Sequence, residues 1–224
     1  MSAPRRLPTV ILISGRGSNL HAILRAVAEQ ALPIDIRAVI SNRPAAPALT
    51  LARDADIPTE ILDHTAFPDR QSFDDALQNL IDSHTPELVV LAGFMRILSP
   101  SFVSHYHGRM LNIHPSLLPA FTGLDTHRRA LEAGVDEHGA SVHFVTHALD
   151  GGPVVLQAHV PPLPGDTAAT LAARVLEAEH RIYPQAIRWF AEGRLHLAGD
   201  AGNEYALLDG KRLAPELVAH AHGH

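Results

Sequence analysis

The chain has 224 residues, a formal net charge of −6 and 46% hydrophobic residues, enough apolar material to bury the core of one compact domain. The absence of cysteine excludes disulfides and thiolate chemistry, and the acidic balance argues against a nucleic-acid-binding surface. Residues 7–14 form the apolar stretch near the N-terminus, which is too short for a membrane span and lacks the form of a signal peptide, so we expect a soluble cytoplasmic protein.

Apolar runs of strand length alternate with segments that have the apolar spacing of helices. In chain order the patterns predict a strand over 10–14, a helix over 20–27, a strand over 36–40, a short helix near 49–55, a brief strand over 60–62, a helix over 73–81, a strand over 88–92, a helix capped by Ser99 and begun by Pro100, and strands over 110–114, 141–145 and 154–160. This alternation is typical of βαβ units and predicts an α/β fold on a mainly parallel sheet.

The C-terminal part has its own signals. After the proline-rich stretch 161–164, a helix is expected to begin near Asp166 or Thr167 and to end before Pro184. Asp209-Gly210 between two short apolar runs predicts a small hairpin. The tail contains His220, His222 and His224, and we interpret it as a polar terminus in preference to a metal site.

A glycine-rich turn, residues 14–20, lies between the first strand and the first helix. Glycines let the backbone approach a ligand, and a helix start presents N–H groups and partial positive charge. We therefore expect Gly17, Ser18 and Asn19 to bind an anion, most naturally phosphate. The alternative, that the glycines only tighten the turn, has about equal weight because short glycine motifs are weak signals.

The sequence also indicates which class of phosphate ligand this turn would bind. A dinucleotide motif needs a third glycine where Leu20 stands and an acid at the end of the second strand, where the chain has Ser41 and Asn42. The Gly-Lys-Ser/Thr of a P-loop is also missing. A simple phosphate monoester fits better.

Asn112 and His114 form the most informative pair. Residues two apart on a strand point to the same side, and Pro115 ends the strand just after them. Ligands of open α/β sheets bind at the carboxyl ends of strands. There an amide can donate to an oxyanion and an imidazole can act as acid or base. A lone buried histidine is usually structural, but the paired asparagine favours catalysis.

Two acids are further candidates. Asp150, in an Asp-Gly-Gly-Pro turn, can orient His114. The alternative is that it is an ordinary turn residue, since aspartate before glycine is common in turns. Glu179 falls on the border of the apolar stripe of the late helix and can reach a cationic amine, although such acids are more often solvated.

Together these motifs resemble the glycinamide ribonucleotide branch of the folate-dependent formyltransferase family. The matching stretches are Val10–Leu20, Leu88–Ser104, Leu111–Pro119, His138–Val145, Leu149–Gln157 and Glu179–Pro184. The Asn-x-His-x-Ser-Leu-Leu-Pro element is shared across that family, whereas the glycine turn and Glu-His-x-Ile-Tyr-Pro are more particular to the branch. The resemblance extends over nearly the whole chain, from about residue 10 to 213.

The resemblance implies a Rossmann-like sheet with helices on both faces and a small C-terminal hairpin and tail. It implies one domain over 1–224, with a phosphate-substrate-binding half over 1–110, a folate-binding and catalytic half over 111–213, and a tail over 214–224. The implied reaction transfers the formyl group of 10-formyltetrahydrofolate, a co-substrate, to the amine of glycinamide ribonucleotide in de novo purine biosynthesis. The partners are then small-molecule substrates, without metal, membrane or nucleic acid, and the enzyme is a monomer or homodimer.

Site residues are implied motif by motif. The catalytic set would be Asn112, His114 and Asp150. The ribonucleotide would contact Gly17, Ser18, Asn19, Leu176, Glu177, Ala178 and Glu179. The folate would contact Arg70, Met95, Arg96, Ile97, Leu98 and Asn112. The chain departs from its relatives at Ala120 and Thr122, where a lysine and a proline are frequent, and this can alter substrate affinity.

Two alternative functions stay open. A 10-formyltetrahydrofolate hydrolase uses the same asparagine, histidine and aspartate on water. A non-catalytic phosphate- or nucleotide-binding module would keep the glycine turn but would have no use for Asn112, His114 and Asp150 together.

Overall fold

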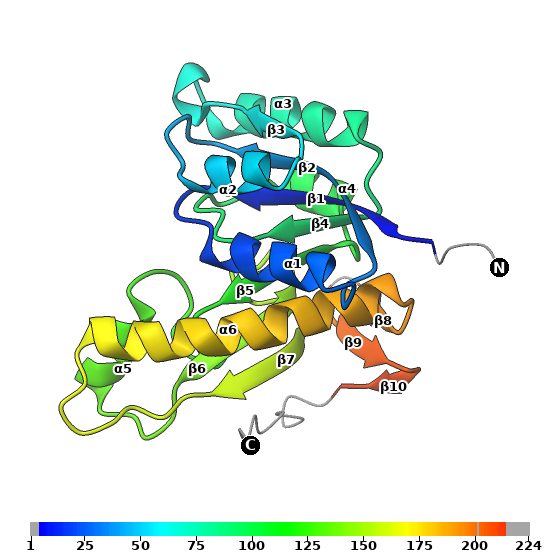
Figure 1. The fold of residues 1–224 in the computed structure, drawn as a ribbon. Helices are drawn as coiled ribbons and strands as arrows, with labels where there is room; N and C mark the ends of the chain where they lie inside the picture. Colours follow the sequence, from blue (N-terminus) through cyan, green and yellow to red (C-terminus); the bar gives the residue numbers. More distant parts are fainter. Residues whose placement is uncertain (1–4, 201, 214–224) are drawn as a thin grey trace. The chain divides into compact units, whose positions relative to one another are not determined.

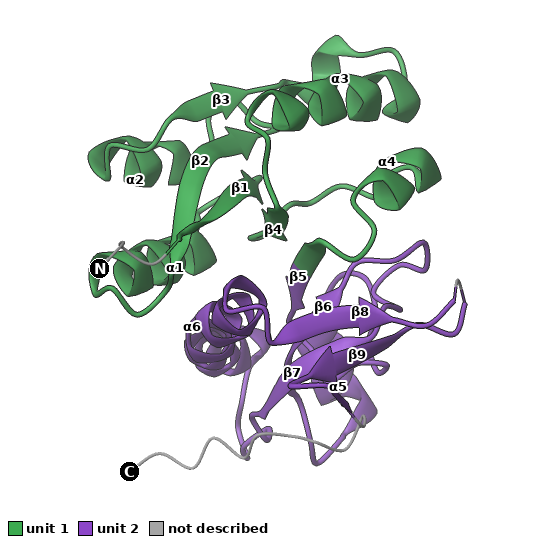
Figure 2. Ribbon diagram, turned by 90° about the vertical axis from the view of Figure 1, so that its right-hand side faces the viewer, with its two compact units in different colours: residues 1–111 green, residues 112–224 purple. Residues whose placement is uncertain are grey.

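The structure, a computed structural model, describes residues 5–200 and 202–213. The chain divides into two compact units, Met1–Leu111 and Asn112–His224, and the boundary falls inside the strand Met110–His114 (Figures 1 and 2). The predicted tail, with His220, His222 and His224, lies outside the described residues. Each unit is built around its own part of the sheet.

Unit 1 alternates strands and helices. Its elements are β1 (Leu7–Ile13), α1 (Ser18–Ala28), β2 (Ile34–Ser41), α2 (Ala48–Asp54), β3 (Thr59–Ile61), the 3-10 turn η1 (His64–Ala66), α3 (Arg70–Ser83), β4 (Leu88–Leu91) and α4 (Pro100–His105). Strand β1 pairs in parallel with β2 and with β4, and β2 pairs in parallel with β3. The alternation of the sequence therefore becomes a parallel sheet, as predicted.

Residues 10–13 of β1 and all of β4 are continuously apolar, because both faces of the sheet are covered there. Residues Val10–Ile13 of β1 and Leu88–Val90 of β4 are fully buried. Helices α1 and α2 lie on one face of this sheet and α3 and α4 on the other (Figure 2). The turns that follow β1 and β4 are thereby fixed on a rigid support.

Unit 2 contains the remaining elements. They are β5 (Met110–His114), which begins in unit 1, α5 (Thr126–Ala133), β6 (Gly139–Phe144), β7 (Val154–His159), α6 (Ala168–Ala191), β8 (Leu195–Ala198), β9 (Tyr205–Leu208) and β10 (Lys211–Arg212). The strand order of the main sheet is β3-β2-β1-β4-β5-β6-β7, and β6 and β7 are antiparallel. Helix α6 packs on β6 and β7, and β8, β9 and β10 form a second, small antiparallel sheet.

The expectation of an α/β fold with a mainly parallel sheet and a C-terminal hairpin is confirmed, and β5 has the predicted bounds. Helix α5 and strand β8 were not predicted. The expectation that the late helix ends before Pro184 is wrong, because α6 continues through it to Ala191. Proline removes one helical hydrogen bond, but Tyr183, Ala186 and Ile187 are fully buried around it, and this packing outweighs the loss.

Within residues 5–200 and 202–213, no helix is long and apolar enough to span a bilayer. The same residues contain no group of three or more histidines and acids placed to hold a metal ion.

Candidate active site

The glycine turn of unit 1 has a conformation that requires Gly17. This residue has φ +78°, and a Cβ built on it would lie 2.4 Å from the Cβ of Ala48. The carbonyl of Gly15 accepts a hydrogen bond from the N–H of Ala48 at 3.2 Å, which fixes the turn against the start of α2. Any side chain at position 17 would therefore displace the turn.

The start of α1 is shaped for an anion. Gly17 occupies the N-cap position, and among the described residues no side chain caps this helix end. Ser18 and Asn19 form the first turn, with Asn19 buried. A helix start capped by glycine directs backbone N–H groups and partial positive charge at a ligand. The geometry suits the predicted phosphate site.

The predicted folate residues of unit 1 lie on α3 and on the segment between β4 and α4. Arg70 is the first residue of α3 and is exposed. The segment Met95–Leu98 is irregular, and the side chains of Met95 and Ile97 are 58% and 57% exposed. Arg96 turns back toward α3, where its guanidinium lies 4.9 Å from the ring centre of Phe73. The segment thus presents apolar side chains, as a site for a flat ring would.

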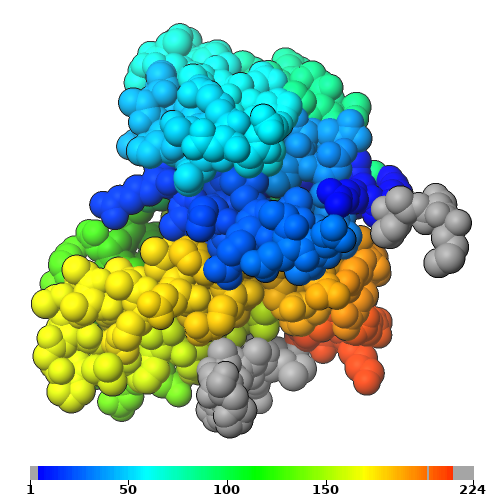
Figure 3. Space-filling model, in the orientation of Figure 1, coloured from blue at the N-terminus to red at the C-terminus, as the bar shows by residue number. Residues whose placement is uncertain are grey.

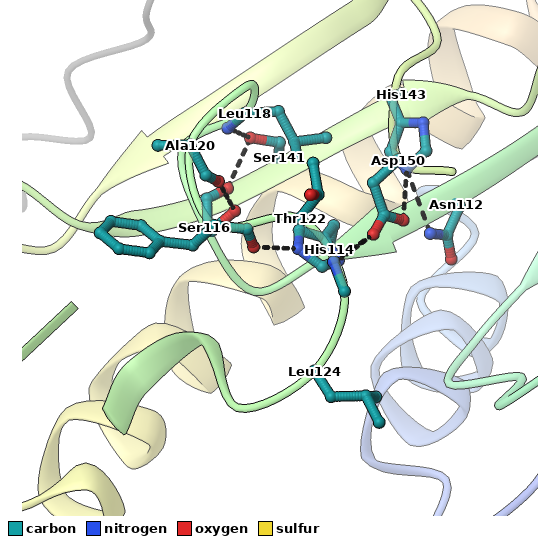
Figure 4. Close-up of polar contacts among 12 residues, drawn as sticks. Asn112, His114, Ser116, Leu118, Ala120, Thr122, Leu124, Ser141, His143 and Asp150 are labelled. Atoms are coloured by element: carbon teal, nitrogen blue, oxygen red, sulfur yellow. Dashed lines mark hydrogen bonds and ion pairs between the residues drawn. The ribbon is translucent and has the colours of Figure 1, made fainter. Parts of the chain in front are cut away.

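In unit 2, Asn112 and His114 project from the last residues of β5 (Figure 4). His114 is 6% exposed and both of its ring nitrogens face oxygen atoms. Nε2 is 2.9 Å from the carbonyl oxygen of Phe121, and Nδ1 is 3.5 Å from Oδ2 of Asp150. Two oxygen acceptors thus flank the two nitrogens of one imidazole.

Asp150 is held beside His114 by its own backbone. It has φ +50°, a left-handed conformation that aspartate tolerates, and its Oδ2 accepts the N–H of Gly123 at 2.8 Å. Close behind it, a Cβ on Gly152 would lie 1.9 Å from the carbonyl oxygen of Phe144, so only glycine fits there. The predicted proximity of Asp150 to His114 is confirmed, and it is compatible with the Asp-Gly turn that was the alternative.

The sequence analysis missed His143, which completes this cluster. It lies on β6, just after a register shift, and is 2% exposed. Its Nδ1 is 2.9 Å from the carbonyl oxygen of Phe144, and its Nε2 is 3.1 Å from Nδ2 of Asn112 and 3.9 Å from Oδ1 of Asp150. Burial lowers the pKa of His143. A neutral ring that donates from Nδ1 accepts at Nε2, so the amide nitrogen of Asn112 points at His143.

The loop after β5 is held by polar side chains. The hydroxyl of Ser141 donates to the carbonyl of Ser116 at 2.6 Å and accepts the N–H of Leu118 at 2.9 Å. Ala120 and Thr122, the two positions expected to depart from the family pattern, contribute backbone carbonyls that accept from Ser116 and Arg129, both at 2.6 Å. Those contacts do not depend on the side chains at positions 120 and 122.

Glu179 lies on α6 and is 7% exposed, so its interpretation as an ordinary solvated acid is wrong. Of the other predicted ribonucleotide contacts on this helix, Ala178 is buried, Leu176 is half-buried and Glu177 is exposed. Along its length, α6 passes from yellow to orange in Figure 3.

The structure brings Asn112, His114, His143 and Asp150 together in unit 2. Gly17, Ser18 and Asn19 share one turn of unit 1, and Met95–Leu98 follows another strand of the same unit. Their roles in binding and catalysis stay predictions.

The chain matches known proteins over most of its length. The family described as "Formyl transferase" matches residues 7–187. Phosphoribosylglycinamide formyltransferase of Escherichia coli (strain K12) is 56% identical over 207 residues, 92% of this chain and 96% of that protein. The trifunctional purine biosynthetic protein adenosine-3 of Homo sapiens is 45% identical over 193 residues, 86% of this chain and 19% of that protein.

A solved structure agrees with the sequence relatives. The phosphoribosylglycinamide formyltransferase of Coxiella burnetii, in complex with CHES, is 55% identical and has a TM-score of 0.88, covering 94% of this chain and 97% of that one. Since the family match and these relatives extend over most of the residues that build both units, the chain belongs to the formyl transferase family.

Proposed function

We propose that this enzyme transfers the formyl group of 10-formyltetrahydrofolate to the primary amine of glycinamide ribonucleotide in de novo purine biosynthesis. One observation carries the proposal. Asn112 and His114 stand at the end of β5 with Asp150 3.5 Å from the imidazole, and the chain is 56% identical to a phosphoribosylglycinamide formyltransferase. An amide, an imidazole and a carboxylate in this arrangement suit acyl transfer to an amine.

The reaction defines what the residues must do. The neutral amine forms a bond to the formyl carbon, the bond between that carbon and the folate nitrogen breaks, and one proton moves from the attacking to the leaving nitrogen. Negative charge develops on the formyl oxygen between these steps. The site must therefore stabilise an oxyanion and move one proton, and no step requires a metal or a covalent enzyme intermediate.

His114 supplies positive charge. Its Nε2–H donates to the carbonyl of Phe121 at 2.9 Å, and the Asp150 carboxylate faces Nδ1 at 3.5 Å. A carboxylate at this place stabilises positive charge on the ring and keeps the ring in place. Because Nε2 is hydrogen-bonded to a backbone carbonyl, His114 acts on the oxyanion as a neighbouring positive charge and not as a direct donor from Nε2. Asp150 assists the proton transfer through water.

Asn112 supplies the hydrogen bond to the oxyanion. Its Nδ2 carries two hydrogens, and one of them is directed at Nε2 of His143, 3.1 Å away. That contact fixes the orientation of the Asn112 amide, with its nitrogen toward His143. The second hydrogen is the donor to the oxyanion, a contact worth about 2.7–4 kcal/mol in comparable sites.

The remaining predicted residues bind the two substrates. Gly17, Ser18 and Asn19 bind the phosphate of the ribonucleotide, and residues 176–179 of α6 contact the rest of it. Arg70 and Met95–Leu98 bind the folate, with the apolar side chains of Met95 and Ile97 against the pteridine. We also propose a cytoplasmic location, small molecules as the only partners, and a monomer or homodimer. The two-half organisation, divided near residue 110, is proposed on the same basis.

One assay tests this function against its alternatives. The purified protein is mixed with glycinamide ribonucleotide and 10-formyltetrahydrofolate, each alone and together, and the folate absorbance is followed. The transferase predicts turnover that requires both substrates. Turnover with the folate alone would identify a hydrolase, and binding of the ribonucleotide without turnover would identify a binding module.

A further inference from the structure

The segment Met95–Leu98 needs support that its exposed apolar side chains do not provide. It has no regular secondary structure, and Met95 and Ile97, its two large exposed apolar residues, are 58% and 57% accessible. Side chains that remain in solvent do not hold a backbone in one conformation by burial. What fixes this segment must therefore act on its ends, on its backbone or on Arg96.

The first end is held by Ser14, the first residue of the glycine turn. Ser14 is 2% exposed, and its hydroxyl accepts the N–H of Met95 at 2.8 Å. The same hydroxyl donates to Oδ1 of Asn42 at 2.5 Å, and the Ser14 N–H donates to the carbonyl of Gly93 at 3.1 Å. Ser14 is thus hydrogen-bonded through its side chain to the first residue of the segment and through its backbone to Gly93, two residues before it.

Asn42 explains why the Ser14 hydroxyl points toward Met95. Asn42 is 1% exposed and stands just after β2, where a dinucleotide-binding chain would have an acid. Its own backbone carbonyl accepts from Nδ1 of His64 at 2.8 Å. Since Oδ1 of Asn42 accepts the hydrogen bond from the Ser14 hydroxyl, the lone pairs of that hydroxyl are directed to the N–H of Met95.

The second end is held by Asp74 on α3. Asp74 is 1% exposed, and its Oδ2 accepts the N–H of Ser99 at 2.5 Å, at the first step into α4. Burial raises the pKa of Asp74, while the Ser99 N–H and the charges of Arg96 and Arg70 act in the opposite direction. A buried carboxylate aimed at a backbone N–H is costly unless that bond and those charges compensate it.

The middle of the segment is held from the same helix. The Arg96 guanidinium lies 4.9 Å from the ring centre of Phe73, which is fully buried and precedes Asp74 in α3. Arg96 is therefore drawn away from solvent, while Met95 and Ile97 on either side of it stay exposed. This alternation leaves two apolar side chains presented at a fixed spacing.

We propose that Ser14 and Asp74 are positioning residues for folate: they hold the two ends of Met95–Leu98, so that Met95, Ile97 and the intervening backbone are pre-arranged for the pteridine of the formyl donor. The inference rests on the proposed function, because it assumes that this segment binds folate. It assigns roles to Ser14, Asn42 and Asp74, and none of these residues is proposed to touch a substrate. Pre-arrangement lowers the entropy that binding must overcome.

The test compares each positioning residue with a matched control. Ser14→Ala removes the hydroxyl, and Ser41→Ala removes an equally buried hydroxyl at the end of β2 that donates to Arg43 instead. Asp74→Ala removes the carboxylate, and Asp82→Ala removes another carboxylate of α3, which accepts from Tyr106 at 2.8 Å. Asp74→Asn keeps one acceptor oxygen and serves as the conservative variant.

Three quantities are measured on the full chain. They are kcat and the KM of each substrate, the dissociation constant of tetrahydrofolate by calorimetry, and hydrogen exchange at the amides of Met95 and Ser99. We expect Ser14→Ala and Asp74→Ala to raise both the KM for 10-formyltetrahydrofolate and the tetrahydrofolate dissociation constant about tenfold or more. The kcat and the ribonucleotide KM should change less than about threefold, and the amide that lost its acceptor should exchange faster.

The outcomes separate the possibilities. Asp74→Asn should bind folate better than Asp74→Ala, and the two control variants should bind it as the unmodified enzyme does. An unchanged folate KM, an equal rise in both KM values, or an equal rise in the controls would each overturn the inference. Equal loss in Asp74→Asn and Asp74→Ala would contradict the hydrogen-bond role. Absence of transfer by the unmodified enzyme would instead refute the proposed function.

Discussion

The two units use different chemistry at their candidate sites. In unit 1, the groups offered to a ligand are backbone N–H groups at Gly17 and the exposed apolar side chains of Met95 and Ile97. The buried polar side chains nearby, Ser14 and Asp74, bond to the backbone. In unit 2, the offered groups are the polar side chains themselves, and Asn112, His114, His143 and Asp150 contact one another.

This difference predicts how each unit responds to substitution. When the backbone moves, a ligand that is bound by backbone groups binds more weakly, and its KM rises. When a side-chain atom that stabilises the transition state is deleted, that stabilisation is lost and kcat falls. Variants of the residues named in unit 1 should therefore change affinity, and variants of the four named in unit 2 should change turnover.

The largest effect should follow from deleting the side chains at the end of β5. We expect Asn112→Ala and His114→Ala each to lower kcat by about 10²–10³-fold, because an oxyanion donor or its neighbouring positive charge is lost. The ribonucleotide KM should stay nearly unchanged, since the proposed phosphate site uses backbone groups of unit 1. Steady-state kinetics on both substrates measures this, and near-normal turnover in both variants would refute the assignment.

A slightly smaller effect is expected at the glycine turn. In Gly17→Ala the new Cβ would meet the Cβ of Ala48 at 2.4 Å in a left-handed conformation, so the turn must shift. We expect the ribonucleotide KM to rise about 30-fold, a loss of about 2 kcal/mol, with the folate KM changed much less.

Gly15→Ala is the matched control for the turn, because a Cβ on Gly15 has nothing within 4 Å and the residue does not have a positive φ. Its ribonucleotide KM should stay close to that of the unmodified enzyme. Equal KM changes for both substrates in Gly17→Ala would argue against a phosphate site at this turn.

The contrast between the units also decided what could be read from the sequence. The pairing of Asn112 with His114 followed from the strand period, and β5 has the bounds expected from its apolar pattern and Pro115. Gly17 followed from the strand-turn-helix order. These are local features, so a single stretch of sequence contains them.

Contacts between distant segments could not be read in this way. His143 meets Asn112 31 positions away, and Met95 meets Ser14 81 positions away. Nothing in either local pattern distinguishes these residues from ordinary core, although His143 stands two residues after Ser141 on a recognised strand. The end of α6 was misjudged for the same reason, because packing around Pro184 outweighed a local helix-ending signal.

His143 provides a sharper test within unit 2. His143→Phe keeps a buried ring but removes the acceptor for Asn112 and the donor to Phe144. We expect kcat to fall about tenfold, about 1.4 kcal/mol, with both KM values little changed. In the Asn112→Ala background the same substitution should have almost no further effect, because the two residues act through one contact. A full tenfold loss in that background would show that His143 acts by another route.

The smallest expected effect concerns the stability of unit 2 in mild acid. His138, 1% exposed, has Nε2 3.0 Å from Nδ1 of His127. Burial, then the nearby charges of His127 and His114, lower the pKa of His138 to about 4, and burial also lowers the pKa of His127. Unfolded histidine titrates near 6.5, so below that pH the unfolded chain binds more protons than the folded chain.

Above pH 6.5 these two groups are neutral in both states and contribute no slope. Between about 6.5 and 4, His138 can remove up to about 1.4 kcal/mol of unfolding free energy per pH unit, and His127 acts in the same direction. Urea titrations at several pH values measure that slope, and His138→Gln should reduce it by about one proton. Val142→Ala, a buried apolar truncation on the same strand β6, should lower stability at every pH and leave the slope as it was. If His138→Gln only shifts the curve downward as Val142→Ala does, the acid sensitivity arises elsewhere, and the dense polar packing of unit 2 would not be its source.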